Sequence, residues 1–123
     1  MTRKLLLICA ILFQSVAFAQ EDAWVFFTDK ENVSEAINNP ISILTQKAID
    51  RKALHNVTID ARDVPLTEAY VTQIKNTAGI TVHARSKWFN ALHIRGSEED
   101  INDLVDLDFV DQVEFANKNS NGS

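Results

Sequence analysis

The chain has 123 residues, with 12 Lys and Arg against 17 Asp and Glu, so its formal net charge is −5 at pH 7. This length corresponds to one ordinary domain, and 46% hydrophobic with 24% charged residues is typical of a globular fold. The acidic balance argues against a nucleic-acid-binding protein. The single cysteine, Cys9, excludes an internal disulfide framework and a zinc site built on several thiolates.

The first 19 residues have the pattern of a secretory signal peptide. A short basic start is followed by an unbroken apolar run over residues 5–13, and the small-x-small sequence over residues 17–19 predicts cleavage between Ala19 and Gln20. The apolar run is too short for a membrane-spanning helix, which needs about 20 residues. We therefore expect a secreted protein, extracellular or periplasmic, with no membrane attachment once the signal is removed.

The exported part is expected to form one domain over residues 20–116, followed by a polar, flexible tail over residues 117–123. The domain begins with a strand over residues 23–28, which is rich in β-branched and aromatic residues. Because successive residues of this segment are apolar, both of its faces carry apolar side chains. We therefore expect a central strand that is covered on both sides.

One helix is predicted between this strand and the next part of the core. Asn39 suits the N-cap and Pro40 the first helical position, and apolar residues recur at helical spacing as far as Ala48. Asn56 is a plausible end of this helix. Residues 56–65 then form a connection.

A second helix is predicted over residues 67–78, with Thr67 as its N-cap and Gly79 at a left-handed C-terminal position. Its apolar stripe consists of four residues: Tyr70, Val71, Ile74 and Ala78. The segments 80–85 and 90–95 alternate between apolar and polar residues, so they predict two strands joined by a short turn.

The alternation in this hairpin predicts a register that pairs apolar residues on one face and histidines on the other. The expected pairs are Val82 with Ile94, Ala84 with Leu92, and His83 with His93. Arg85 and Arg95 would flank the two histidines. Two histidines alone would make an incomplete metal site, so we expect no metal there.

The last predicted elements are a helix and a strand. Ser97 can cap the helix, and the acidic residues 98–100 suit its positive N-terminal end. The apolar stripe of this helix has three residues: Ile101, Leu104 and Val105. The final strand is expected over residues 109–115.

If the helix over residues 39–56 is an insertion, the order is strand, helix, strand, strand, helix, strand. This is an α+β plan, the ferredoxin-like split βαβ sandwich, with its helices on one face of the sheet. Five residues are expected in the core between the helices and the sheet: Ile74, Leu92, Ile94, Leu104 and Val113. Whichever pair of the first strand points away from the helices, Trp24/Phe26 or Val25/Phe27, is a candidate binding surface unless the insertion or a second copy covers it.

The sequence carries no signal of catalysis or of a cofactor. Its three glycines, at positions 79, 96 and 122, cannot form a glycine-rich phosphate loop. It has no Gly-x-Ser-x-Gly motif, and its histidines fall on no metal-binding motif. We therefore expect no catalytic, cofactor-binding or metal-binding residue.

Five segments in order give the chain a family resemblance: AWVFFTDK (23–30), ILTQKAIDR (43–51), IDARDVP (59–65), SKWFN (86–90) and FVDQVEFA (109–116). The succession resembles the N-terminal propeptide of secreted bacterial subtilisin-like serine proteases, over about residues 23–117. The resemblance implies a ferredoxin-like domain that templates the folding of the protease domain and then inhibits it. The partner would be a subtilisin-like domain, in cis or in trans.

The resemblance also implies that the open sheet face packs on the protease and that the C-terminal tail enters its active-site cleft. The segments of the subtilisin triad are not among the 123 residues, so no catalytic role is carried over and the chain is not expected to be an enzyme on its own. We expect a truncated precursor or a free-standing inhibitor, and a small exported ferredoxin-like binding module is the alternative. The candidate protease contacts are Trp24, Phe26, His83, Arg85, His93, Arg95, Phe115 and Ala116.

Overall fold

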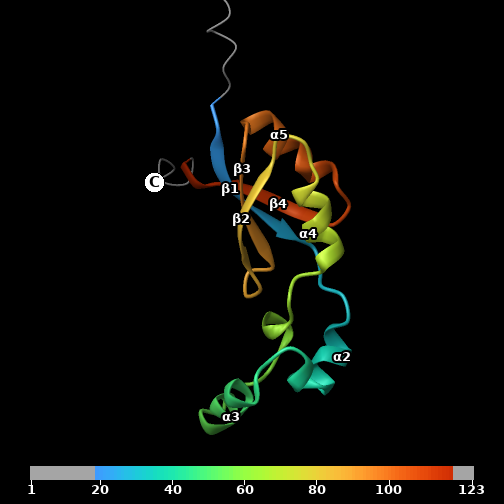
Figure 1. Ribbon diagram of the computed structural model, residues 1–123, viewed down its shortest axis with the longest axis vertical. Helices are drawn as coiled ribbons and strands as arrows, with labels where there is room; N and C mark the ends of the chain where they lie inside the picture. The colour runs from blue at the N-terminus through green and yellow to red at the C-terminus, as the bar shows by residue number, and fades with distance from the viewer. Residues whose placement is uncertain (1–18, 118–123) are drawn as a thin grey trace, which may run out of the picture.

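The computed structural model describes residues 19–117 and shows a four-stranded antiparallel sheet with helices on one side (Figure 1). The sheet order is β2-β3-β1-β4, which is the order of a ferredoxin-like split βαβ sandwich. The strands are β1 (Glu21–Phe27), β2 (Thr81–Ser86), β3 (Ala91–Gly96) and β4 (Val110–Phe115). The helices α4 (Glu68–Lys75) and α5 (Glu98–Asp103) cover one face of the sheet. The predicted fold class is confirmed.

Strand β1 lies at the centre of the sheet, paired with β3 on one side and β4 on the other. Ala23, Val25 and Phe27 are buried under the helices, while Trp24 and Phe26 alternate with them and are only half-buried. The prediction of a central strand is therefore confirmed. The expectation that both faces are covered is wrong for the face that carries Trp24 and Phe26.

The core lies between the sheet and helices α4 and α5. Four of the five predicted core residues are at most 2% exposed: Ile74, Leu92, Ile94 and Leu104. Val113 is only partly buried, at the margin of this cluster. Burying a side chain of this size contributes about 1.5–3 kcal/mol of stability, so this cluster is the main source of the fold's stability.

Two residues of the predicted helix stripes are exposed, Ala78 and Val105. Helix α4 ends at Lys75, so Ala78 no longer follows its helical stripe. Val105 lies in the 3₁₀ turn η3 (Leu104–Asp106), where residues advance by a third of a turn and leave the α-helical stripe.

Of the predicted caps of α4 and α5, one is confirmed and one is wrong. The Ser97 hydroxyl accepts a hydrogen bond from the Asp100 amide and caps α5. The Thr67 hydroxyl accepts a hydrogen bond from the Glu31 amide instead of capping α4.

The single helix predicted over residues 39–56 is wrong. The segment holds the 3₁₀ turn η1 (Pro40–Ser42) and α3 (Gln46–Leu54), and a further helix that was not predicted, α2 (Val33–Asn38), lies just before it. Thr45 is extended, and its hydroxyl accepts a 3.1 Å bond from the Ala48 amide, so it starts a new helix inside the predicted one. Asn39 makes no side-chain cap, although Pro40 does open η1. The predicted end is confirmed, because Asn56 has a left-handed φ of 56° just after α3.

Residues 33–63, from α2 to the 3₁₀ turn η2 (Ala61–Asp63), form what we call the inserted lobe. It extends beyond the end of the sheet at which the β2–β3 turn lies (Figure 1). No residue of α3 is buried, and Ala36 is the only buried residue of α2. The lobe therefore lacks a hydrophobic core comparable to that of the sheet.

The register of the β2–β3 hairpin differs from the prediction. Val82 pairs with Ile94 as expected, but a β-bulge lies between Val82 and Ala84. Ala84 therefore pairs with His93, not with Leu92, and His83 is not directly opposite His93. A bulge inserts one extra residue into a strand, so it reverses the faces of the residues beyond it.

Candidate functional site

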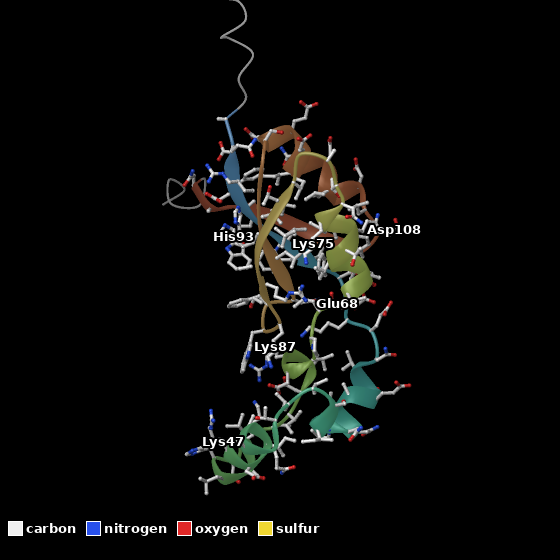
Figure 2. All side chains as sticks on the ribbon, viewed as in Figure 1. Lys47, Glu68, Lys75, Lys87, His93 and Asp108 are labelled. Atoms are coloured by element: carbon white, nitrogen blue, oxygen red, sulfur yellow. The ribbon has the colours of Figure 1, made fainter. Side chains whose placement is uncertain are left out.

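The surface of interest is the side of the sheet that faces away from α4 and α5, which we call the open face. The pairs of β1 with β3 and β4 place eight residues on it: Asp22, Trp24, Phe26, Ala91, His93, Arg95, Gln112 and Glu114. Figure 2 labels His93 on this side, and Glu68 and Lys75 on α4 at the other side. No helix of residues 19–117 packs over this face.

Trp24 stands at the centre of the open face and is held by its neighbours. Its ring lies 5.4 Å from the His93 ring, at a tilt of 31°. His93 in turn contacts Asp22, with 3.3 Å between Nε2 and Oδ1, and its ring lies 5.5 Å from that of His83. The two histidines are thus neighbours on this face even though the bulge prevents the predicted direct pairing. These contacts preset the orientation of Trp24, which lowers the entropy lost when a partner binds.

A hollow of about 390 Å³ is part of this face. It is lined by Trp24, Phe26, Phe89, Glu114 and Ala116, so three aromatic rings and one carboxylate surround it. Phe89 belongs to the β2–β3 turn and is 71% exposed. An exposed aromatic hollow with a polar rim is suited to an apolar side chain of a partner protein.

The predicted contact residues do not all lie on this face. Trp24, Phe26, His93 and Arg95 lie on it, His83 lies beside His93, and Ala116 lines the hollow. Arg85 lies on the helix side, because the bulge reverses its face; its Nη1 is 2.6 Å from Glu68 Oε1 of α4. Phe115 is 8% exposed and belongs to the core. The predicted orientation of Arg85 towards the open face is therefore wrong.

Two exposed aromatic residues, Trp88 and Phe89, were not predicted as contact residues from the sequence. Both lie in the β2–β3 turn, and Trp88 is 50% exposed. The available signal was their position, because two adjacent aromatic residues in a short polar turn have little core to reach. The predicted signal cleavage site, Ala19 and Gln20, precedes β1, and both residues are exposed. The rest of the predicted signal peptide and of the tail beyond Asn117 lies outside the described residues.

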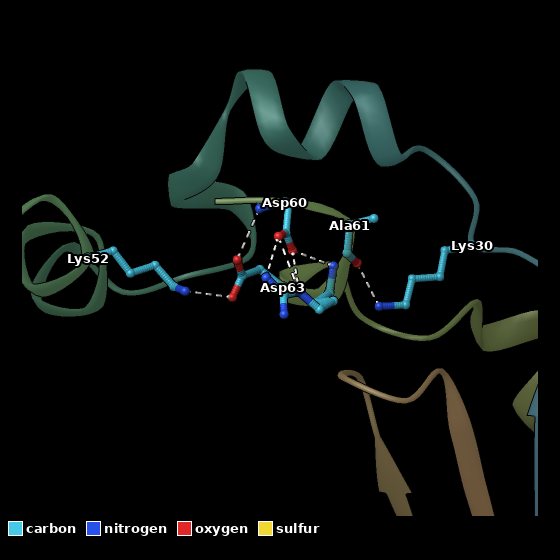
Figure 3. A network of polar contacts seen from close by, with 6 residues as sticks. Lys30, Lys52, Asp60, Ala61 and Asp63 are labelled. Carbon is cyan, nitrogen blue, oxygen red and sulfur yellow. Dashed lines mark hydrogen bonds and ion pairs between the residues drawn. The ribbon is translucent and has the colours of Figure 1, made fainter. Parts of the chain in front are cut away.

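A network of polar contacts runs through the inserted lobe and connects it to Lys30, which lies between β1 and α2 (Figure 3). Lys30 Nζ donates to the carbonyls of Ala61 and Lys87, at 2.8 and 2.6 Å. Within the lobe, the Arg62 guanidinium donates to Asp60, and this bond holds the pKa of the Asp60 carboxyl below its usual value. Asp63 is 2% exposed and forms a 3.2 Å ion pair with Lys52.

Among residues 19–117, no group of three His, Cys, Asp or Glu side chains is placed to hold a metal ion. The same part of the chain has no helix that is long and apolar enough to cross a membrane.

Comparison with known proteins identifies the family. A family model described as the peptidase S8 propeptide domain of Bacteroidota matches residues 22–123. No curated protein and no solved structure gives a significant match. A propeptide domain is not itself catalytic, and the family implies association with a peptidase S8 protease domain. The match covers most of the chain and confirms the resemblance seen in the sequence: the chain belongs to the Bacteroidota family of peptidase S8 propeptide domains.

Proposed function

We propose that this domain is the folding template and the inhibitor of a subtilisin-like protease domain, which it binds through the open face. The observation that carries the proposal is the half-buried pair of Trp24 and Phe26 on the uncovered side of the sheet. An apolar strand face without a covering layer is unfavourable in an isolated domain, so a partner surface is expected to cover it. The family match supplies the class of partner.

Both activities follow from binding the same surface. A domain that binds the folded protease more tightly than the unfolded chain stabilises the folded form in proportion to its affinity. The same bound domain inhibits if the chain after β4 reaches the active site. An extended segment can add to substrate-binding strands through its backbone hydrogen bonds. We propose this role for the segment that follows Phe115.

We also propose that the precursor is secreted, with residues 1–19 as its signal peptide and cleavage after Ala19. The support is the basic start, the apolar run and the small-x-small sequence. The partner protease domain can be attached in cis or supplied in trans, since the binding surface is the same in both cases.

The experiment is an inhibition assay of the cognate peptidase S8 domain with the purified chain. We expect the wild-type chain to slow peptide hydrolysis and to raise the yield of refolded protease. Trp24→Ala should raise the inhibition constant at least about 30-fold, the ratio that corresponds to roughly 2 kcal/mol for a central aromatic contact. Phe89→Ser is a second variant at an exposed position that the fold does not need, and it should weaken inhibition less.

The matched control is Lys75→Ala, an exposed change on α4 at the other side of the sheet. It should leave both activities unchanged. If the wild-type chain neither inhibits nor assists refolding, the proposed function is wrong. If Lys75→Ala weakens inhibition as much as Trp24→Ala does, the partner does not bind through the open face.

A further inference from the structure

A second concave surface lies between the β2–β3 turn and the inserted lobe. It encloses about 210 Å³ and is lined by residues from the sheet and from the lobe: Asp29, Lys30, Val33, Ala61, Arg62, Trp88 and Asn90. Asn90 fixes one wall, because its side-chain amide donates to the carbonyls of Phe27 and Asp29 at 3.3 and 2.9 Å. We call this hollow the junction pocket.

Positive charge is concentrated at the junction pocket. Lys30 reaches across it to the carbonyls of Ala61 and Lys87. Burial lowers the pKa of Lys30, and the neighbouring Lys87 ammonium lowers it further against the opposing effect of Asp63 and Asp60. Lys87 forms no ion pair with any residue that the structure describes. Lys30 lines the pocket and Lys87 lies beside it, close enough to repel the Lys30 ammonium, so a carboxylate near both groups would be stabilised.

The aromatic wall of the pocket is already oriented. The Trp88 ring has the Arg62 guanidinium carbon 4.9 Å and the Lys52 ammonium 5.7 Å from its centroid. Asp60 holds Arg62 and Asp63 holds Lys52, so neither cation must be ordered when a ligand arrives. Among the described residues that line the pocket, Asp29 is the only acid, and the hydroxyls of Tyr70 and Thr28 donate to its Oδ1.

The charge of the rest of the chain restricts what can bind there. The net charge is −5, and every charged residue over 98–114 is acidic. The field of such a domain repels a free acidic ligand at long range. A carboxylate is therefore expected in the junction pocket only if a partner that is already bound elsewhere on the domain delivers it.

Consecutive residues of the β2–β3 turn line the junction pocket and the hollow of the open face. Phe89 lines the hollow of the open face, and the preceding residue, Trp88, lines the junction pocket. A partner that lies on the open face and extends past the β2–β3 turn therefore reaches the pocket. The inserted lobe, which makes the far wall, would then form part of the same interface.

We propose that the junction pocket binds an acidic side chain from a surface loop of the protease domain, so that the inserted lobe extends the interface beyond the open face. This inference rests on the proposed function and names the chemistry of one further contact with the same partner. The carboxylate would accept hydrogen bonds from Lys30 and Lys87, beside the Trp88 ring. Such a contact at the rim of an interface acts mainly on association rate and salt dependence.

The test compares two charge reversals that change the net charge equally, Lys87→Glu at the pocket and Lys75→Glu on α4. Inhibition of the cognate peptidase S8 domain is measured with the full chain at low and high salt. Lys87→Glu should raise the inhibition constant at low salt by about tenfold, and the difference should shrink at high salt. Lys75→Glu should stay near the wild-type value. Lys87→Gln, which removes the charge without reversing it, should fall between the wild type and Lys87→Glu.

Fluorine NMR of Trp88 is a second measurement, and it reports on the junction pocket itself. The chain has two tryptophans, so a 5-fluorotryptophan-labelled chain gives two ¹⁹F resonances, which the Trp24→Phe variant assigns. The Trp88 resonance should shift when the protease domain binds, and Lys87→Glu should reduce that shift. Equal inhibition by the two charge reversals, or an unchanged Trp88 resonance in an inhibited complex, would overturn the pocket contact and leave the proposed function intact. An absence of inhibition by the wild-type chain would overturn both.

Discussion

The sheet with its two helices and the inserted lobe are stabilised in different ways. In the sheet, residues such as Val25, Ile74 and Leu92 are at most 1% exposed and form one hydrophobic cluster. In the lobe, α3 buries no residue, and Leu54 at its end is 78% exposed. Helices as short as α3 are marginal in water without tertiary packing. Polar contacts, rather than a core, therefore hold the lobe in place.

This difference suggests that the two regions open independently. Local opening needs least free energy where few apolar contacts are broken. The sheet should open only when the whole domain unfolds, whereas the lobe can detach while the sheet stays folded. The open face thus belongs to the rigid sheet, whereas the junction pocket is formed between the rigid sheet and the labile lobe.

The largest expected effect is a difference in stability between two leucine substitutions, one in the core of the sheet and one in the lobe. Leu104→Ala removes a side chain that is 2% exposed in the core and should cost about 2–5 kcal/mol. Small domains have only about 5–15 kcal/mol in total, so the variant should be close to unfolded. Leu54→Ala, with the same chemical change on the lobe, should change stability by less than about 0.5 kcal/mol. Urea titrations followed by circular dichroism measure both. Equal costs for the two changes would show that the lobe has a core after all.

A smaller global effect is expected at Gly79, which connects α4 to β2. Its φ of +81° lies in the left-handed region, and a Cβ there would also collide with the side chain of Asp100. Gly79→Ala should destabilise the domain by about 1–2 kcal/mol. Asn76→Ala, nearby and exposed with an ordinary helical backbone, is the control and should stay within about 0.5 kcal/mol of the wild type. A Gly79→Ala variant as stable as the control would contradict the strain argument.

The sequence was most informative where burial dictates the pattern. Strand β1, strand β3 and most of the stripes of α4 and α5 follow the spacing of apolar residues, and these elements lie close to where they were predicted. The exceptions are the stripe residues Ala78 and Val105 and the bulge in β2. The lobe was predicted poorly because it has no buried face to impose such a pattern. Helix α2 begins after Asn32, whose left-handed φ of 58° and missing side-chain cap leave no sequence signal. Thr45 restarts a helix through one local hydrogen bond, which apolar spacing does not show.

Part of the candidate site was predicted from the sequence, and part of it was missed. Trp24 and Phe26 were one of two pairs that the sequence left open, because β1 is apolar on both faces, and the burial of Ala23, Val25 and Phe27 decides between them. Arg85 was assigned to the wrong face because a single bulged residue reverses everything beyond it, and nothing in the local sequence marks the bulge. Trp88 was missed because its environment is made by the lobe, through contacts of Arg62 and Lys52 that are distant in sequence.

The attachment of the lobe can be tested at Lys30. Lys30→Met removes the ammonium that donates hydrogen bonds to two carbonyls. A hydrogen bond contributes about 1 kcal/mol of net stability. Opening of the lobe should therefore need less free energy, and amide exchange in α3 should become about fivefold faster. Exchange of the Leu92 amide in the sheet should not change, because the sheet does not depend on the lobe. Lys47→Met, an exposed change on α3 itself, is the matched control. Faster exchange in both regions would show that lobe and sheet unfold as one unit.

The smallest expected effect is a pH dependence confined to the lobe. The side-chain and backbone hydrogen bonds from Arg62 hold the pKa of Asp60 below its ordinary value of 3.8. A carboxyl group whose pKa is lower in the folded state stabilises that state at pH values above its unfolded pKa, and the contribution is lost as the pH falls through its folded pKa. Since Asp60 orients Arg62 beside Trp88, the fluorescence of Trp88 in a Trp24→Phe chain should change with a midpoint below pH 3.8, while the circular dichroism of the sheet stays constant. Asp60→Asn should abolish this transition, and a midpoint at or above 3.8, or one that survives in Asp60→Asn, would assign the change to another group.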